Sequence, residues 1–155
     1  MSARIANYPA AAPAGYKAAA QLEAALKASG LEYSLFELVK TRASQINGCA
    51  FCIHMHTTDA MKHGETPMRL FLLDAWRESS LYSPRERAAL AWTESLTEIA
   101  DKGAPDAEYE ELTRHFSEAE IVNLTMLIGL INLWNRLAIG LRSPHPVKAG
   151  DQRAA

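Results

Sequence analysis

The stretch "EYSLFELVKTRASQINGCAFCIHMHTTDAMKHG", residues 32–64, decides the predicted fold, because it contains two helical patterns separated by Asn47-Gly48. Apolar residues recur at helical intervals before this pair. Glycine readily adopts left-handed backbone angles, so an Asn-Gly pair indicates a chain reversal or a helix cap. The second helix is predicted to run from Cys49 to about His63 and to end at Gly64. Two consecutive helices joined by a tight turn are therefore expected.

The segments on both sides of this pair also have helical patterns, with little of the period-2 alternation that indicates strands. Ser83 and Ser117 each precede a glutamate by three residues, which is the capping-box signature of a helix start. Residues 121–141 are apolar nearly all round, which favours burial in a bundle or in a subunit interface. We predict an all-α helical bundle, with further helices at residues 11–29, 67–79, 84–100, 105–116 and 121–141.

Length and composition predict one domain over residues 1–155, with a flexible C-terminal tail at about residues 143–155. The formal net charge of -2 and the isoelectric point near 6.2 argue against a nucleic-acid partner. The amino terminus lacks a signal-peptide core, and we expect no stretch that approaches the roughly 20 apolar residues of a membrane span. A cytoplasmic protein with no membrane partner is expected.

The only two cysteines, Cys49 and Cys52, lie three residues apart at the predicted helix start. On a helix they fall within about 60° of His56, whereas His54 points to another side. Free N–H groups and the positive dipole end at a helix start lower the pKa of a nearby thiol. The pattern therefore predicts a redox-active dithiol that can close a disulfide across one helical turn.

A zinc site is the first alternative, formed by both cysteines with His56 and His63. It is disfavoured because zinc ligand pairs usually come from two separate segments, and here one helix would supply all four. The second alternative is a pair of buried, inert cysteines, which are common in proteins. The added imidazole on the same face disfavours that interpretation. We therefore predict neither a metal nor a cofactor.

Several polar residues interrupt the long apolar helix predicted near the C-terminus. Unpaired polar groups in a core are costly, so these side chains need partners. We expect the partners in subunit contacts. The residues are Asn123, Asn132, Asn135 and Arg136.

The spacing of the dithiol segment resembles a known family. Glu37 is followed after eleven residues by Cys49-x-x-Cys52, and three further residues lead to His56. This resembles the Glu-x11-Cys-x-x-Cys-x3-His signature of the AhpD-like alkylhydroperoxidases, in the carboxymuconolactone decarboxylase superfamily. The similarity extends over about residues 33–142. It implies an all-helical homotrimer or homohexamer that reduces a hydroperoxide substrate or a partner peroxiredoxin and takes electrons from a dithiol donor.

The resemblance also implies roles for four residues. Cys52 is the peroxide-attacking thiol, Cys49 resolves the resulting sulfenic acid, and Glu37 and His56 form the proton relay. AhpD itself carries a further histidine directly before the second cysteine, and Phe51 occupies that position here. His54 is expected outside the site.

Two other functions stay open at this point. The same superfamily contains lactone decarboxylases, but these do not rely on a Cys-x-x-Cys pair, so the intact motif disfavours that activity. The remaining alternative is a non-catalytic redox sensor or zinc-binding module, in which the same helix serves as a switch.

Overall fold

Every regular element is a helix within residues 2–146, the part of the chain that the computed structural model describes. This confirms the predicted all-α fold. The elements are α1 (Tyr8–Ala11), α2 (Pro13–Lys27), α3 (Tyr33–Asn47), α4 (Ala50–Lys62), α5 (Pro67–Phe71), the 3-10 helix η1 (Leu73–Ala75), α6 (Pro84–Thr97), α7 (Ile99–Lys102), α8 (Asp106–Thr113) and α9 (Glu118–Gly140).

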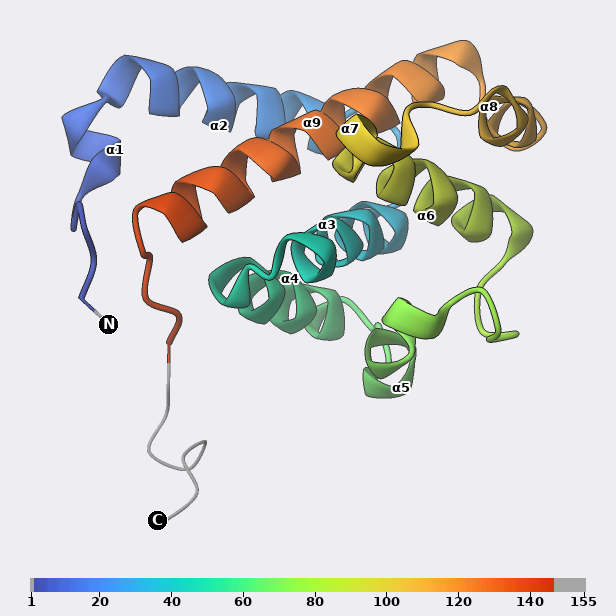
Figure 1. Ribbon diagram of the computed structural model, residues 1–155, viewed down its shortest axis with the longest axis horizontal. Coiled ribbons are helices and arrows are strands. Elements are labelled where there is room, and N and C mark those ends of the chain that lie inside the picture. The colour runs from blue at the N-terminus through green and yellow to red at the C-terminus, as the bar shows by residue number, and fades with distance from the viewer. Residues whose placement is uncertain (1, 147–155) are drawn as a thin grey trace.

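Helix α3 lies at the centre of the molecule, in contact with α4, α6 and α9 (Figure 1). Its Phe36 and Val39 belong to a buried cluster shared with α2, α6, α8 and α9. Its Leu38 belongs to a second cluster, formed with α4, α5, η1 and α6. A helix covered on several sides also buries its polar residues. Those residues of α3 are Glu37, Lys40, Thr41 and Ser44.

The two predicted capping boxes are confirmed. The Ser83 hydroxyl accepts from the Glu86 N–H at the start of α6, and the Glu86 carboxylate accepts from the Ser83 N–H at 2.8 Å. Ser117 and Glu120 repeat this reciprocal pair at the start of α9. Each box satisfies backbone donors that a helix start leaves unpaired.

The prediction of one continuous helix at residues 67–79 is wrong. The segment divides into α5 and η1, and after Ala75 the chain continues in turns without a regular helix. The Arg87 guanidinium donates to the carbonyls of Trp76, Arg77 and Ser79 at 2.7 to 3.0 Å. These carbonyls are satisfied by a side chain from α6, so the segment needs no further helical turn.

The other predicted helices differ mainly at their ends. The helix predicted to end at residue 100 stops at Thr97, and the short α7 follows. Cys49 lies one position before α4, as its N-cap, and α1 has no counterpart among the predicted elements. Of the predicted tail, residues 143–146 follow α9 without helix, and residues 147–155 lie outside the described residues.

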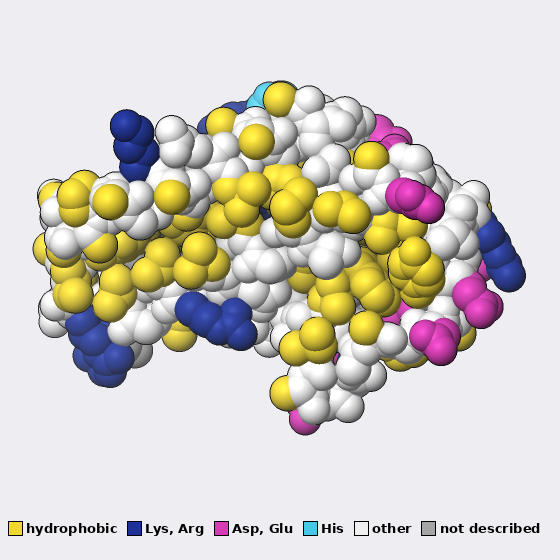
Figure 2. Space-filling model, turned by 90° about the horizontal axis from the view of Figure 1, so that it is seen from above, with side chains coloured by type: hydrophobic (Ala, Val, Ile, Leu, Met, Phe, Trp, Pro, Cys, Tyr) yellow, Lys and Arg dark blue, Asp and Glu magenta, His cyan; other side chains and the backbone are white. Residues whose placement is uncertain are grey.

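Helix α9 is half-buried, whereas its sequence predicted burial nearly all round. By length and mean hydropathy alone α9 could cross a membrane, although no such stretch was expected from the sequence. Half of its most apolar stretch is buried within the protein, as in a core helix. Figure 2 shows the molecule from above, from the side on which α2 and α9 lie in Figure 1, and apolar side chains form a broad band on this face. The exposed apolar residues of α9 are Val122, Met126, Leu133 and Ile139.

Glu94 of α6 is a buried carboxylate that joins three parts of the chain. It accepts from Arg42 Nε of α3 and from Trp76 Nε1, both at 2.8 Å, and it pairs with Arg77. Burial raises the pKa of the Glu94 carboxyl, but these three donors together lower it below its ordinary value. The cluster holds the non-helical segment after η1 against α3 and α6.

We expect Glu94→Ala to lower the free energy of unfolding by about 3 kcal/mol, because it removes the acceptor of Arg42 Nε and of the buried Trp76 Nε1. Urea denaturation followed by circular dichroism measures this loss. Glu98→Ala is the matched control: Glu98 is more exposed and pairs with Lys102, so its loss should cost under about 0.5 kcal/mol.

The difference in the free energy of unfolding between wild type and Glu94→Ala should become smaller at acid pH. A carboxyl with a lowered pKa in the fold stabilises the protein above its unfolded pKa, and that contribution is lost as pH falls through the folded value. Equal losses for Glu94→Ala and Glu98→Ala at neutral pH would show that the cluster contributes no special stability.

Candidate redox site

The turn between α3 and α4 places both cysteines at the start of α4. Gly48 adopts a φ of 69°, in the left-handed region that favours glycine, and ends α3. The Cys49 N–H donates to the Ser44 carbonyl at 2.9 Å, which closes the turn. The chain reversal predicted at Asn47-Gly48 is therefore confirmed.

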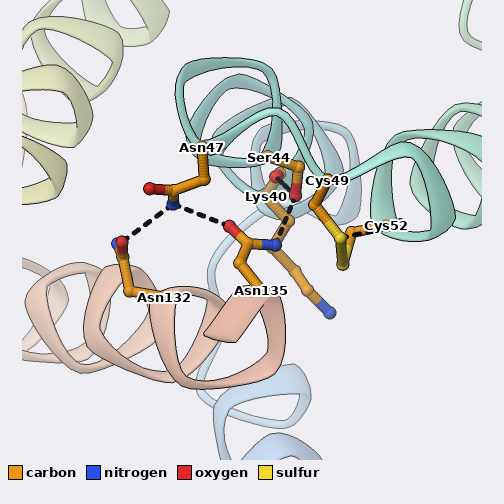
Figure 3. Close-up of a disulfide and its surroundings, with 7 residues drawn as sticks. All are labelled: Lys40, Ser44, Asn47, Cys49, Cys52, Asn132 and Asn135. Carbon is orange, nitrogen blue, oxygen red and sulfur yellow. Dashed lines mark hydrogen bonds between the residues drawn. A yellow bond between two sulfur atoms is a disulfide. The ribbon is translucent and has the colours of Figure 1, made fainter. Parts of the chain in front are cut away.

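A network of amide side chains holds this turn against α9 (Figure 3). Asn47 Nδ2 donates to the Oδ1 atoms of Asn132 and Asn135, each at 2.9 Å. Asn135 Nδ2 in turn donates to Ser44 Oγ at 3.0 Å. The expectation that Asn132 and Asn135 find their partners across a subunit contact is wrong, because the same chain supplies them.

A disulfide joins Cys49 and Cys52, with their Cα atoms 5.3 Å apart (Figure 3). Each cysteine is 1% exposed. The Cys52 N–H donates to Cys49 Sγ at 3.3 Å, so a backbone donor of the first helical turn points at this sulfur. The two thiols are thus close enough to cycle between dithiol and disulfide.

Glu37 of α3 and His56 of α4 form a buried pair. A Glu37 carboxylate oxygen lies 2.8 Å from His56 Nδ1, and the two residues are 1% and 3% exposed. A carboxylate only accepts, so it orients the ring with the hydrogen on Nδ1. Burial lowers the pKa of His56, Glu37 opposes this, and the charge of Lys40 adds to the lowering. The imidazole is therefore neutral at neutral pH.

The second ring nitrogen of His56 is free. Nε2 is buried and has no hydrogen-bond partner among residues 2–146. His56 follows Cys52 by four residues on α4, so the two side chains lie on one face of the helix. The structure thus brings the predicted Glu37, Cys49, Cys52 and His56 together, and it leaves a bare imidazole nitrogen one turn from Cys52.

The other two histidines of the segment lie elsewhere, and helical geometry predicts this for His54. The His54 ring packs near the His145 ring, with centroids 5.7 Å apart. His63 is exposed and packs against Tyr33, with Nδ1 2.8 Å from the Asp59 carbonyl. Within residues 2–146, no three histidine, cysteine or acidic side chains are placed to hold one metal ion.

Lys40 and Glu23 form an ion pair that sequence reasoning missed. Lys40 of α3 is 2% exposed, and Glu23 of α2 also accepts from Trp134 Nε1 at 2.8 Å. Burial lowers the pKa of Lys40, and Glu23 opposes that effect. The sequence contained one signal for this pair. Lys40 follows Glu37 by three residues, so it lies on the same face of this buried helix, where a lysine needs an acidic partner.

A pocket of about 290 Å³ opens beside Cys52. Lys40 and Glu23 provide its charged groups, and the remaining lining is mostly aromatic and apolar. Such a mixture of apolar walls and a few polar groups is typical of a small-molecule site. The apolar lining residues include Tyr8, Tyr16, Phe51, Met55 and Trp134.

Comparison with known proteins shows the family of this chain. The sequence model of the carboxymuconolactone decarboxylase family matches residues 13–95. The uncharacterized protein YdfG of Bacillus subtilis is 45% identical over 141 residues, which are 91% of this chain and 95% of YdfG.

Solved structures show the same fold. A protein of unknown function from Agrobacterium tumefaciens, named as a candidate AhpD antioxidant defence protein, matches with a TM-score of 0.91 and 48% identity, over 95% of this chain and all of that one. The debrominase Bmp8 matches with a TM-score of 0.76 and 20% identity, over 84% of this chain and 70% of Bmp8, and this likeness concerns the fold alone. The chain belongs to the carboxymuconolactone decarboxylase family and has the AhpD-like fold.

Proposed function

We propose that this protein is a thiol-dependent peroxidase of the AhpD type, which reduces hydroperoxides, or a partner peroxiredoxin, through Cys49 and Cys52. The observation that carries the proposal is the bare Nε2 of the buried, neutral His56, held by Glu37 one helical turn from Cys52. A neutral imidazole oriented by a carboxylate is a competent general base for a thiol.

In the first step, the Cys52 thiol transfers its proton to His56 Nε2 in the reduced protein. The thiolate then attacks the outer oxygen of the hydroperoxide, and the O–O bond breaks. Cys52 becomes a sulfenic acid, and the alkoxide leaving group takes the proton from His56 and departs as an alcohol. Cys49 attacks the sulfenic sulfur, which releases water and forms the observed disulfide.

The pocket beside Cys52 supports a hydroperoxide with an apolar body. Its aromatic lining includes Phe51, at the position where AhpD carries a histidine. An apolar side chain there supplies no proton, so the relay in this chain consists of Glu37 and His56. The exclusion of water by apolar walls strengthens the electrostatic effect of the imidazole on the thiol.

Lactone decarboxylation, the reaction in the family's name, fits these residues less well. It involves no thiol redox step, whereas both cysteines here lie in a disulfide beside a general base. A homotrimer or homohexamer remains part of the proposal, and the exposed apolar residues of α9 support self-association.

The two cysteines should differ in single-variant tests. Cys52→Ser removes the attacking sulfur, so hydroperoxide consumption should fall to the uncatalysed rate. Cys49→Ser keeps the attacking thiol but not the resolving one, so it should consume one equivalent per subunit and stop at a sulfenic acid that dimedone labels. Peroxide consumption by purified, fully reduced protein measures both. Hydroperoxide consumption by Cys52→Ser above the uncatalysed rate would refute the mechanism.

Removal of the base should change the reactivity of Cys52 more than it changes stability. In His56→Asn, alkylation of Cys52 should shift to higher pH, and the rate constant with hydroperoxide should fall about 100-fold. Glu37→Gln should give a smaller loss, because the ring remains but is less firmly oriented.

Glu94→Gln is the matched control for these variants, because it alters another buried glutamate that lies outside the redox site. It should leave the pH dependence of Cys52 alkylation unchanged. If the alkylation profile of His56→Asn overlays that of the wild type, His56 is not the base.

A further inference from the structure

A second groove reaches the disulfide from the side of Cys49. It has a volume of about 460 Å³ and shares Phe51 and Ala138 with the pocket beside Cys52. Cys49 lines only this groove, and Cys52 lines only the other pocket. Phe51 lies between the two cysteines in the chain and borders both spaces. The two sulfurs are therefore approached through different openings.

The groove has a positive character. The charge comes from Arg142, which lines the groove together with His145, and no aspartate or glutamate of residues 2–146 lines it. Arg142 has a φ of 57°, the one positive φ outside glycine in the described part of the chain. Its N–H donates to the Ile139 carbonyl at 3.2 Å, and the Ser143 N–H donates to the Ala138 carbonyl at 2.8 Å. These bonds turn the chain back at the end of α9 and place Arg142 at the groove.

We propose that this groove admits the reductant of the disulfide, a low-molecular-weight thiol that carries carboxylates. The inference rests on the proposed dithiol function. Cys49 is only 1% exposed, so a sulfur that attacks it must reach it on a narrow chain. The volume suits a molecule of about tripeptide size. The Arg142 guanidinium pairs with a carboxylate through two parallel hydrogen bonds.

Reduction of the Cys49–Cys52 disulfide consumes two molecules of the thiol. The thiolate of the first attacks Cys49 Sγ, the Cys49–Cys52 bond breaks, and Cys52 leaves as a thiolate beside His56. The second thiolate attacks the sulfur of the bound reductant in the mixed disulfide. This releases the oxidised reductant as its own disulfide and returns Cys49 as a thiol. Two electrons pass to the protein, and solvent supplies the protons that the thiols released.

The test compares glutathione with glutathione diethyl ester, the same peptide thiol with both carboxylates masked. Oxidised full-length protein is mixed with each thiol, and the loss of the Cys49–Cys52 disulfide is followed by alkylation and mass spectrometry. Rate constants are expressed per thiolate. Glutathione should react faster than its diethyl ester. Arg142→Glu should lower the ratio of the two rate constants roughly fivefold. Arg114→Glu makes the same charge change at an exposed site directly after α8, and it should leave the ratio of the two rate constants unchanged.

Added salt should also reduce the ratio of the rate constants of glutathione and its diethyl ester, because salt screens exposed charges. An equal ratio in wild type and Arg142→Glu would overturn the proposal. So would a disulfide that resists both thiols but is reduced by a thioredoxin-type protein. Failure of the peroxidase function has a separate signature: the thiol preference would be present, while reduced protein would not react with hydroperoxide.

Discussion

The buried hydrogen bond between Glu37 and His56 is the interaction on which the site depends. It joins the central helix α3 to α4, and it uses one ring nitrogen so that the other remains free on the face of Cys52. The Gly48 turn and the amide network with α9 hold the start of α4 at the place where this bond can form. A neutral, oriented base next to a thiol follows from that geometry.

Burial of so many polar groups in one helix is costly unless each finds a partner. Helix α3 meets this requirement from three directions. Lys40 pairs with Glu23 of α2, Arg42 with Glu94 of α6, and Ser44 accepts from Asn135 of α9. Only His56 Nε2 and the Thr41 hydroxyl lack partners among the described buried side chains. The first of these is the atom to which the mechanism assigns the proton.

The sequence predicted what local patterns determine. Helical periodicity, the Asn47-Gly48 turn and two capping boxes depend on neighbours a few residues apart, and the structure has all of them. Contacts between distant segments were not predictable. The Arg87 bonds that interrupt the helix predicted at 67–79, and the Lys40–Glu23–Trp134 cluster, join residues that only the folded chain brings together. The spacing of Glu37 and His56 was recognised through the family signature, whereas their hydrogen bond required the fold.

The proposed proton transfer from Cys52 to His56 can be tested through the protonation state of the His56 ring. Nitrogen-15 NMR of histidine-labelled protein reports the two ring nitrogens separately. In the disulfide form, we expect a neutral ring with hydrogen on Nδ1 and none on Nε2. After reduction, Nε2 should become protonated at a pH below the ordinary thiol pKa, in step with the ionisation of Cys52. A ring that stays neutral on reduction, while Cys52 titrates as an ordinary thiol, would contradict this proton transfer.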